Sequence, residues 1–261
     1  MASGSPYGAP KKRLGQHFLK DPNTARIVAD GVTETDTVLE IGPGRGALTT
    51  VLAGRARLVH AVELDPEVLP ELQRSIEGLS NVEVYLADAM KFDYSALEPE
   101  PGVLCANLPY NVGSPLVLKF LEEVPGLRRL RFMVQLEVAR RMAAAPRSRD
   151  YGAYSVLVQA LASVRLVHRV SPRVFEPQPR VWSAVVELER REPPMAEYAG
   201  FKELVAAAFV NRRKRLARKL PDPALAESVL VGLGFGVSAR AEELSPGDFA
   251  ALLERTDAGR R

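Results

Sequence analysis

The chain has 261 residues, of which 46% are hydrophobic and 26% charged, with a formal net charge of +3. This composition is typical of a globular protein, and the length suits one large domain or one domain with a small appendage. No apolar stretch approaches the ~20 residues of a transmembrane helix, and three histidines and one cysteine show no metal-ligand spacing. We therefore expect no membrane span and no metal, while a sequence pI of about 9.0 favours a polyanionic partner.

Residues 1–14 are rich in Gly, Pro and Ser and end near Lys11-Lys12-Arg13, with no apolar segment behind them. This pattern predicts a flexible basic arm without a secretory signal, and so a cytoplasmic protein. The first patterned segment covers residues 14–19, and Asp21 followed by Pro22 predicts the start of a helix.

A predicted strand over residues 38–41 runs directly into the turn Gly42-Pro43-Gly44-Arg45-Gly46, and residues 47–53 then read as a helix. Glycines let the backbone approach a ligand closely, so strand, turn and helix together indicate a nucleotide-type cradle. The spacing is G-x-G-x-G and differs from the dinucleotide pattern. An ordinary turn remains the alternative.

Each of the next two predicted strands leads to an acidic residue. Residues 58–62 lead to Glu63, which lies 21 residues after Gly42, where a carboxylate can accept both hydroxyls of a ribose. A helix over 66–77 and a strand over 82–86 lead to Asp88, which can bind an adenine amine beside Ala89 and Met90. A solvated Glu at a strand end is the plain alternative for Glu63.

A buried strand over residues 103–106 leads to Asn107-Leu108-Pro109-Tyr110-Asn111. Open α/β sheets hold their ligands at this carboxyl end of the strands. Asn107 offers an oxygen to an amine N–H, Pro109 stiffens the turn, and Tyr110 offers a face on which a base can stack. The alternative is an ordinary Asn/Pro turn with Tyr110 as packing.

Helices over 115–123, 137–144 and 153–162 and strands over 130–135, 165–170 and 184–188 complete the predicted α/β part. Two prolines, Pro177 and Pro179, forbid regular structure in the loop before the last strand. Phe175 on this loop is either a core aromatic or a site contact, and Trp182 is expected in the core.

Residues 190–194 read as a linker, after which helices are predicted over 198–210, 212–220, 223–233 and 245–255. Val205, Phe209, Leu216 and Leu220 repeat at helical spacing and predict a buried stripe. Six of the nine residues from 211 to 219 are basic and none is acidic. These cations are either a solvated face or, as we expect, a phosphate-contacting surface.

These motifs together resemble the bacterial ribosomal RNA small-subunit adenine dimethyltransferase family over nearly the whole chain. The segments that carry the resemblance are residues 15–19, 40–49, 63–65, 88–90, 107–111, 174–183 and 209–214. The resemblance implies an α/β fold, a Rossmann-like class I methyltransferase sheet with helices on both faces, plus a small all-α C-terminal domain. The expected divisions are the arm at 1–14, a catalytic domain at 15–189 and a helical RNA-binding domain at 194–261.

The implied reaction is S-adenosylmethionine-dependent dimethylation of the N6 amines of two adjacent adenosines in a hairpin loop near the 3′ end of 16S rRNA. The implied context is a monomer that acts on the small ribosomal subunit or its precursor during subunit biogenesis, with S-adenosylmethionine as methyl donor and no metal.

Site roles follow from the resemblance. The cofactor-binding residues would be His17, Leu19, Gly42, Gly44, Glu63, Leu64, Asp88, Ala89 and Asn107. The catalytic residues would be Asn107, Leu108, Pro109, Tyr110 and Phe175, and the RNA-binding residues Arg212, Arg213, Lys214, Arg215, Arg218 and Lys219. The family usually has Asn where this chain has His17, and a neutral His can still donate one proton to the cofactor carboxylate.

Three alternatives stay open. One is the erythromycin-resistance type of adenine methyltransferase, which acts on large-subunit rRNA. A DNA amino-methyltransferase would more typically show Asn-Pro-Pro-Tyr, whereas this chain has Leu108. A third is a non-catalytic relative that serves in transcription or ribosome assembly, against which the intact Gly42, Glu63, Asp88 and Asn107 argue.

Overall fold

The computed structural model describes residues 16–210 and 214–258 and divides the chain into two compact units. The first unit comprises the chain up to Ala139 together with Arg165–Arg190, and the second comprises Arg140–Val164 and the chain from Arg191. The division at Arg190 falls beside the linker expected at 190–194. The sequence placed Arg140–Val164 in the catalytic domain, whereas these residues pack with the C-terminal helices.

The first unit is built on a seven-stranded sheet of order β4-β3-β2-β5-β6-β9-β7. Parallel pairing joins β4, β3, β2, β5 and β6 in that order, and β9 runs antiparallel to β6. The strands are β2 (Thr37–Ile41), β3 (Leu58–Glu63), β4 (Val82–Leu86), β5 (Val103–Asn107), β6 (Arg129–Gln135), β7 (Ala162–Val170) and β9 (Ser183–Arg190).

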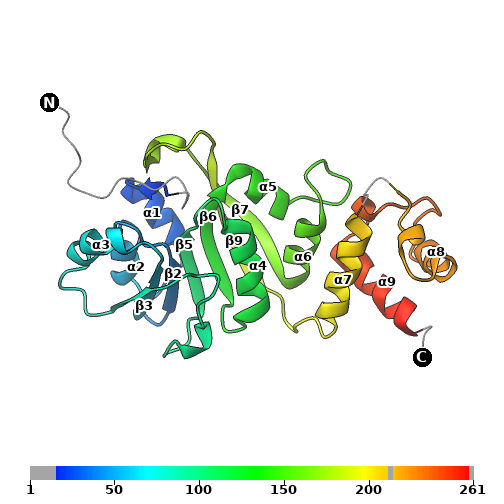
Figure 1. Ribbon diagram of the computed structural model, residues 1–261, viewed down its shortest axis with the longest axis horizontal. Coiled ribbons are helices and arrows are strands. Elements are labelled where there is room, and N and C mark those ends of the chain that lie inside the picture. Colours follow the sequence, from blue (N-terminus) through cyan, green and yellow to red (C-terminus); the bar gives the residue numbers. More distant parts are fainter. Residues whose placement is uncertain (1–15, 211–213, 259–261) are drawn as a thin grey trace. The chain divides into compact units, whose positions relative to one another are not determined.

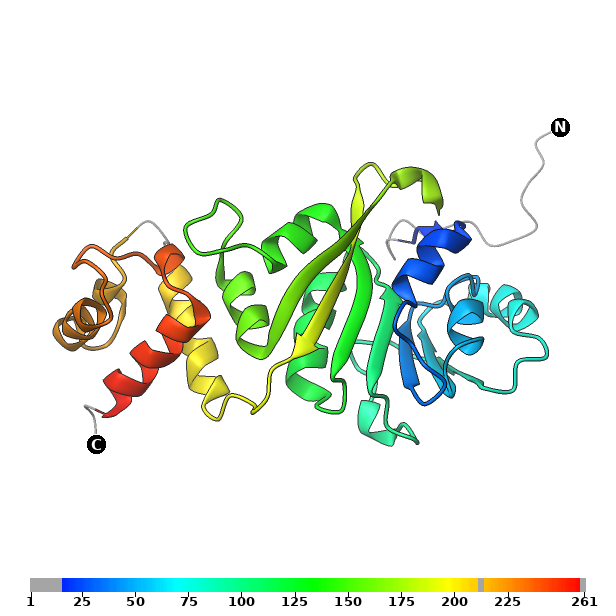
Figure 2. The ribbon, with the colours of Figure 1, turned by 180° about the vertical axis from the view of Figure 1, so that it is seen from behind.

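Helices cover both faces of this sheet. In Figure 1 helix α4 lies in front of the sheet, and in Figure 2, seen from behind, α1 does so. All five residues of β2 are buried, as expected for a parallel strand covered on both sides. The helices are α1 (Pro22–Val28), α2 (Thr49–Ala53), α3 (Leu69–Ser75), α4 (Gly113–Glu123) and α5 (Leu136–Met142). The predicted doubly covered α/β sheet is confirmed.

Local sequence signals account for several element ends. The side chain of Asp21 accepts a hydrogen bond from the Thr24 N–H at 2.8 Å and Pro22 opens α1, as predicted from this pair. The predicted helix over 66–77 is divided into a 3₁₀ turn and α3. Short 3₁₀ helices lie at Pro66–Val68, Tyr94–Ala96, Pro172–Val174, Ala217–Lys219 and Ala241–Glu243.

A second, two-stranded sheet was not predicted. It pairs β1 (Phe18–Leu19) antiparallel with β8 (Phe175–Glu176), so that Leu19 lies opposite Phe175. Phe175 is fully buried in the core of the first unit. The short sheet therefore fastens the segment around residue 18 to the segment before β9.

The core position expected for Trp182 is wrong. Its side chain is 47% exposed, and the Arg169 guanidinium lies over its ring at 5.2 Å from the centroid. Trp182 immediately precedes β9. The first residue of this strand, Ser183, is fully buried, whereas Trp182 is not. The strand's inward register therefore begins one residue after the indole.

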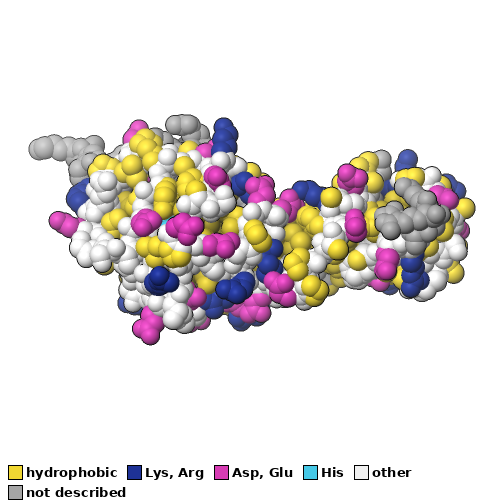
Figure 3. Space-filling view, turned by 90° about the horizontal axis from the view of Figure 1, so that it is seen from below, with side chains coloured by type: hydrophobic (Ala, Val, Ile, Leu, Met, Phe, Trp, Pro, Cys, Tyr) yellow, Lys and Arg dark blue, Asp and Glu magenta, His cyan; other side chains and the backbone are white. Residues whose placement is uncertain are grey.

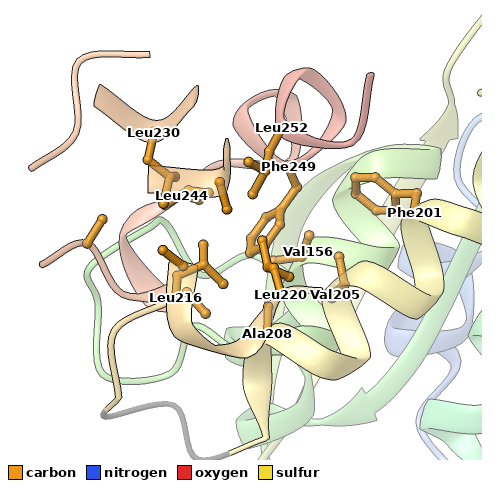
Figure 4. Close-up of a cluster of buried hydrophobic side chains, with 14 of the residues drawn as sticks. Val156, Phe201, Val205, Ala208, Leu216, Leu220, Leu230, Leu244, Phe249 and Leu252 are labelled. Atoms are coloured by element: carbon orange, nitrogen blue, oxygen red, sulfur yellow. The ribbon is translucent and has the colours of Figure 1, made fainter. Parts of the chain in front are cut away.

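The second unit packs four helices around one apolar cluster, shown in Figure 4. The helices are α6 (Ala153–Leu161), α7 (Tyr198–Phe209), α8 (Pro223–Gly232) and α9 (Pro246–Ala258). Val156 of α6, Phe201 of α7 and Phe249 of α9 are fully buried in the cluster. The contribution of α6 explains why Arg140–Val164 belongs to this unit.

The single helix predicted over 212–220 is wrong for the residues that the structure describes there. Helix α7 ends at Phe209, and Val210 adopts an extended conformation with φ −61° and ψ 120°. The Leu216 N–H donates to the Ala239 carbonyl at 2.8 Å, and only a 3₁₀ turn follows. This tertiary hydrogen bond overrides the helical pattern, although Val205, Leu216 and Leu220 are buried as predicted. Arg212 and Arg213 lie outside the described residues.

Candidate active site

A cavity of about 240 Å³ lies where β2, β3, β4 and β5 end. Twelve of the residues predicted for the cofactor and the reacting base line it together. They are His17, Leu19, Gly42, Gly44, Glu63, Leu64, Asp88, Ala89, Asn107, Leu108, Pro109 and Tyr110. Segments separated by up to ninety-three residues thus meet at the carboxyl ends of the parallel strands, where open α/β sheets hold their ligands.

The glycine turn after β2 needs its glycines. Gly42 and Gly44 have φ values of +66° and +56°, in the region that favours glycine. A Cβ on Gly44 would also lie 2.9 Å from Cδ1 of Phe18, and one on Gly46 would lie 2.9 Å from Cβ of Ser75. Backbone atoms therefore form this wall of the cavity, which suits a ligand that approaches the chain closely.

Glu63 fastens this turn to the end of β3. One carboxylate oxygen accepts from the Gly44 N–H at 3.0 Å, and the other accepts from the Leu64 and Asp65 N–H groups, each at 2.8 Å. Burial raises the pKa of Glu63 above its ordinary value, and these three donors oppose the rise. Carboxylate oxygens keep further lone pairs, so Glu63 can still accept hydroxyl groups.

Asp88 follows β4 and is fixed by its own turn. Its Oδ1 accepts from the Met90 N–H at 2.9 Å. No described residue donates to Oδ2. The Tyr94 hydroxyl donates to the Ala89 carbonyl at 2.7 Å and holds the neighbouring backbone. One carboxylate oxygen thus stays available to a ligand amine.

Asn107 carries a buried oxygen without a partner. Its Nδ2 donates to the His17 carbonyl at 3.0 Å, which fixes the carboxamide. Its Oδ1 is buried and accepts no hydrogen bond within the described chain. An unpaired buried acceptor costs roughly 1–3 kcal/mol, so it marks a position where a donor from a ligand fits.

Tyr110 and His17 form a wall beside Asn107. Their ring centroids are 5.1 Å apart, and the Tyr110 hydroxyl forms a hydrogen bond with the Ser183 hydroxyl. Burial raises the pKa of Tyr110, and the hydrogen bond to Ser183 opposes the rise. Both rings are therefore held in place before any base arrives.

His17 differs from the expectation in one respect. Its Nδ1 lies 2.7 Å from the Pro177 carbonyl oxygen, which can only accept, so Nδ1 carries the proton of the neutral ring. That single proton is used within the protein, and Nε2 is then an acceptor. A neutral His17 in this arrangement does not donate to a cofactor carboxylate; it acts on the site through its carbonyl bond to Asn107.

Phe175, predicted to hold a base, is not brought into the cavity. It does not line the cavity and is fully buried in the apolar core. Because β8 pairs with β1, Phe175 lies opposite Leu19, which does line the cavity. Phe175 thus supports the wall from behind.

Glu40 and Thr49 were missed by the sequence analysis. Glu40 lines the cavity and is 1% exposed, and neither its Oε2 nor the Thr49 hydroxyl has a partner among the described residues. Burial raises the pKa of Glu40 to about 8, and the nearby Glu63 adds to the rise. The available signal was a lone acid in the otherwise apolar strand Val38-Leu39-Glu40-Ile41.

The basic segment of the second unit is only partly as expected. Lys214, Arg215 and Arg218 are exposed. Lys219, predicted to contact RNA, instead donates to the Ala208 carbonyl at 2.6 Å, and burial lowers its pKa. On the face shown in Figure 3, the basic and acidic side chains of the described residues are interspersed.

The donor set of the cavity fits a nucleoside-containing cofactor. Besides the buried Glu40, its polar groups include a glycine-rich backbone wall, two carboxylates and one unpaired amide oxygen, from Gly44, Glu63, Asp88 and Asn107. Within the described ranges no three His, Cys, Asp or Glu side chains gather as a metal site would require. The described helices are also too short or too polar to cross a membrane.

Comparison with known proteins points to a methyltransferase of ribosomal RNA. The model of the family described as ribosomal RNA adenine dimethylase matches residues 9–256. A relative from Rubrobacter xylanophilus named ribosomal RNA small subunit methyltransferase A is 66% identical over 248 residues, covering 94% of this chain and 95% of its own. A relative of the same name from Mycobacterium tuberculosis is 40% identical, covering 95% and 83%.

Two solved structures are similar throughout. A dimethyladenosine transferase from Plasmodium falciparum gives a TM-score of 0.82 at 28% identity and covers 93% of this chain and 98% of its own. The 23S rRNA methyltransferase ErmE gives a TM-score of 0.72 at 31% identity, covering 92% and 99%. Both likenesses extend over nearly the full length of each chain.

The sheet order, the glycine turn and the acidic strand ends define a class I methyltransferase. More particularly, the chain belongs to the ribosomal RNA adenine dimethylase family. It is thus an S-adenosylmethionine-dependent enzyme of ribosomal RNA adenine methylation, and the expected fold class, family and enzyme class are confirmed.

Proposed function

We propose that this enzyme dimethylates the N6 amines of two adjacent adenosines in the hairpin loop near the 3′ end of 16S rRNA. The observation that carries the chemistry is the buried, unpaired Oδ1 of Asn107 in the cavity. The choice of the small subunit is supported by the 66% identical relative, whose name specifies that subunit. The enzyme then acts as a cytoplasmic monomer on the small subunit or its precursor, as a step of subunit biogenesis.

The residues that would hold S-adenosylmethionine follow from their contacts. Glu63 would accept the ribose hydroxyls, Asp88 Oδ2 the adenine amine, and the backbone at Gly42 and Gly44 would lie along the methionine part. The bound cofactor supplies an electrophilic methyl group on a sulfonium. Leu19, Leu64 and Ala89 line the same cavity and would contact its apolar surface.

The protein's part in the reaction is to position and polarise the target amine. An adenine amine is a poor nucleophile because its lone pair is delocalised into the ring. Asn107 Oδ1 can accept one N–H. The second acceptor would be the backbone carbonyl of Leu108 or of Pro109; the Pro109 carbonyl accepts from the Val112 N–H at 3.2 Å and keeps a second lone pair.

Two acceptors on the two N–H bonds favour a pyramidal nitrogen whose lone pair points away from them. Such contacts strengthen as positive charge develops on nitrogen, which stabilises the transition state more than the ground state. Tyr110 would hold the base by its face. The transfer forms an N–CH3 bond as the sulfonium S–CH3 bond breaks, and the methylated nitrogen then loses one proton to water. One N–H remains, so the second transfer relies on a single acceptor.

RNA binding outside the cavity would involve the second unit. Lys214, Arg215 and Arg218 are exposed and would contact phosphates, while Lys219 serves the unit's own structure. These contacts would add affinity without base selection.

A large-subunit substrate is the competing proposal, because ErmE is also similar. Mass spectrometry of both ribosomal RNAs, from cells lacking the enzyme and complemented with this chain, separates the two. We expect a pair of dimethyladenosines near the 3′ end of 16S rRNA, absent with Asn107→Ala. Dimethyladenosine only in 23S rRNA would contradict the proposal.

A further inference from the structure

The chain's single tryptophan lies in solvent in an unusual setting. Trp182 is 47% exposed, and the neighbouring Val181 is 45% exposed. Tryptophan is highly buried on average and is enriched at interaction surfaces, where its ring supplies a large contact area. None of the roles described so far uses this indole.

The backbone that carries Trp182 is firmly fixed. The Trp182 carbonyl accepts from the Leu136 N–H at 2.9 Å. The following residue, Ser183, is fully buried and lies opposite Gln135 in the β6–β9 ladder. The Arg169 guanidinium lies over the ring. The indole is therefore an ordered aromatic surface, and ordering it on binding costs little entropy.

The backbone of Trp182 adjoins a residue that contacts the cavity wall. Ser183 forms a hydrogen bond with the Tyr110 hydroxyl, and the Pro177 carbonyl accepts from His17. Tyr110 and His17 both line the cavity. Because consecutive Cα atoms are about 3.8 Å apart, Trp182 starts one residue from the group that anchors Tyr110.

The local charge is cationic. Arg169, Arg173 and Arg180 are all exposed on the segments around Trp182, and Glu176 is the one acidic residue between residues 165 and 183. A planar ring with a guanidinium stacked on it and further arginines nearby matches a nucleotide, in which a flat base is joined to a phosphate.

We propose that Trp182, supported by Arg169, stacks an unpaired RNA base that neighbours the adenosine held in the cavity. The proposal rests on the proposed function for the identity of the RNA. It assigns to the first unit an RNA contact that does not depend on the basic segment of the second. Stacking of one base corresponds to roughly 5- to 100-fold in affinity.

The indole itself is the reporter, because no other tryptophan contributes fluorescence. The probe is an RNA hairpin with two adjacent adenosines in its loop, and the control is a fully paired duplex of equal length. We expect the hairpin to quench the Trp182 emission at saturation and the duplex to leave it unchanged. Equal quenching by both RNAs would overturn the proposal.

Substitutions test the energy of the contact. Trp182→Ala should weaken hairpin binding by roughly 5- to 100-fold, while Trp182→Phe should retain most of the affinity because it keeps a stacking face. Val231→Ala, at another exposed apolar residue in α8, is the control and should leave affinity unchanged. Wild-type affinity in Trp182→Ala would overturn the proposal, and an unchanged S-adenosylmethionine affinity shows that the cavity is intact.

The two proposals fail separately. If wild-type enzyme methylates 16S rRNA but its tryptophan is not quenched by the hairpin, stacking at Trp182 is wrong and the proposed function stands. If the hairpin quenches the tryptophan but only 23S rRNA is methylated, stacking stands and the proposed function is wrong.

Discussion

Asn107 and His17 are joined by a hydrogen bond of 3.0 Å from the carboxamide nitrogen of Asn107 to the His17 carbonyl oxygen. The bond uses the donor end of the carboxamide and leaves the acceptor end, Oδ1, unpaired and buried. His17 is itself held by the Pro177 carbonyl through its ring. The orientation of the Asn107 carboxamide is thus set by a segment ninety residues earlier in the chain.

The first prediction concerns Asn107→Ala. Removing an acceptor that strengthens in the transition state should lower kcat by roughly 10²–10³-fold and change the KM for S-adenosylmethionine much less. Steady-state methylation of small-subunit particles measures both parameters. A kcat close to that of the wild-type enzyme would show that Asn107 does not contact the reacting nitrogen.

The second prediction concerns Glu63, which accepts from three backbone N–H groups and would also bind the ribose. Glu63→Ala should reduce S-adenosylmethionine affinity by about tenfold or more and also lower the melting temperature, because the Gly44, Leu64 and Asp65 donors lose their partner. Glu63→Gln keeps an acceptor oxygen, so its S-adenosylmethionine affinity and melting temperature should lie between those of the wild-type enzyme and of Glu63→Ala. Calorimetry that finds no loss in the alanine variant, or equal affinity for NAD, would sink the assignment.

The third prediction follows from the buried Glu40, whose pKa is raised from 4.5 to about 8. Between these values the folded protein keeps a proton that the unfolded chain has lost, so the free energy of unfolding falls as pH rises from 4.5 to about 8. The slope from one such group is at most about 1.4 kcal/mol per pH unit.

Glu40→Gln removes this group and should flatten that slope. Glu63 contributes a slope of the same sign, since its pKa is also raised, so some dependence should remain. Urea unfolding at several pH values, without ligand, gives the measurement. Identical slopes in wild type and variant would mean that Glu40 ionises normally in the folded state.

The fourth prediction separates surface cations from a structural one. Replacing Lys214, Arg215 and Arg218 with Ala should weaken RNA binding and reduce its salt slope by about two to three log units per log unit of salt. Lys219→Met, which loses the bond to the Ala208 carbonyl, should lower stability and leave the salt slope unchanged. An unchanged slope in the triple variant would identify these cations as a solvated face.

The strand ends could be predicted from the sequence because each combines an apolar run with a chemically distinct residue. Gly42, Glu63, Asp88 and Asn107 each follow or end such a run, and parallel strands bring these ends together. A pair of very short strands leaves no such pattern in the sequence. The two-residue pairing of Leu19 with Phe175 spans most of the first unit and has no periodicity to read.

The other errors arose where tertiary contacts decide. The spacing of apolar residues around Leu216 fitted a helix, yet the Leu216 N–H donates to the Ala239 carbonyl. Trp182 was expected in the core because of its residue type alone, whereas Ser183 takes the buried position. The proton on Glu40 depends on burial by residues from several elements, which no local pattern reports.

The pairing of β1 with β8 has a consequence for biosynthesis. A chain leaves the ribosome N-terminus first, so Phe18 and Leu19 emerge long before Phe175 and Glu176, their partners. Likewise, the His17 ring can form its hydrogen bond only after Pro177 has been made, and the Tyr110 hydroxyl only after Ser183 has been made. The wall of the cavity can therefore be completed only late in translation, after residues 175–183 have been made.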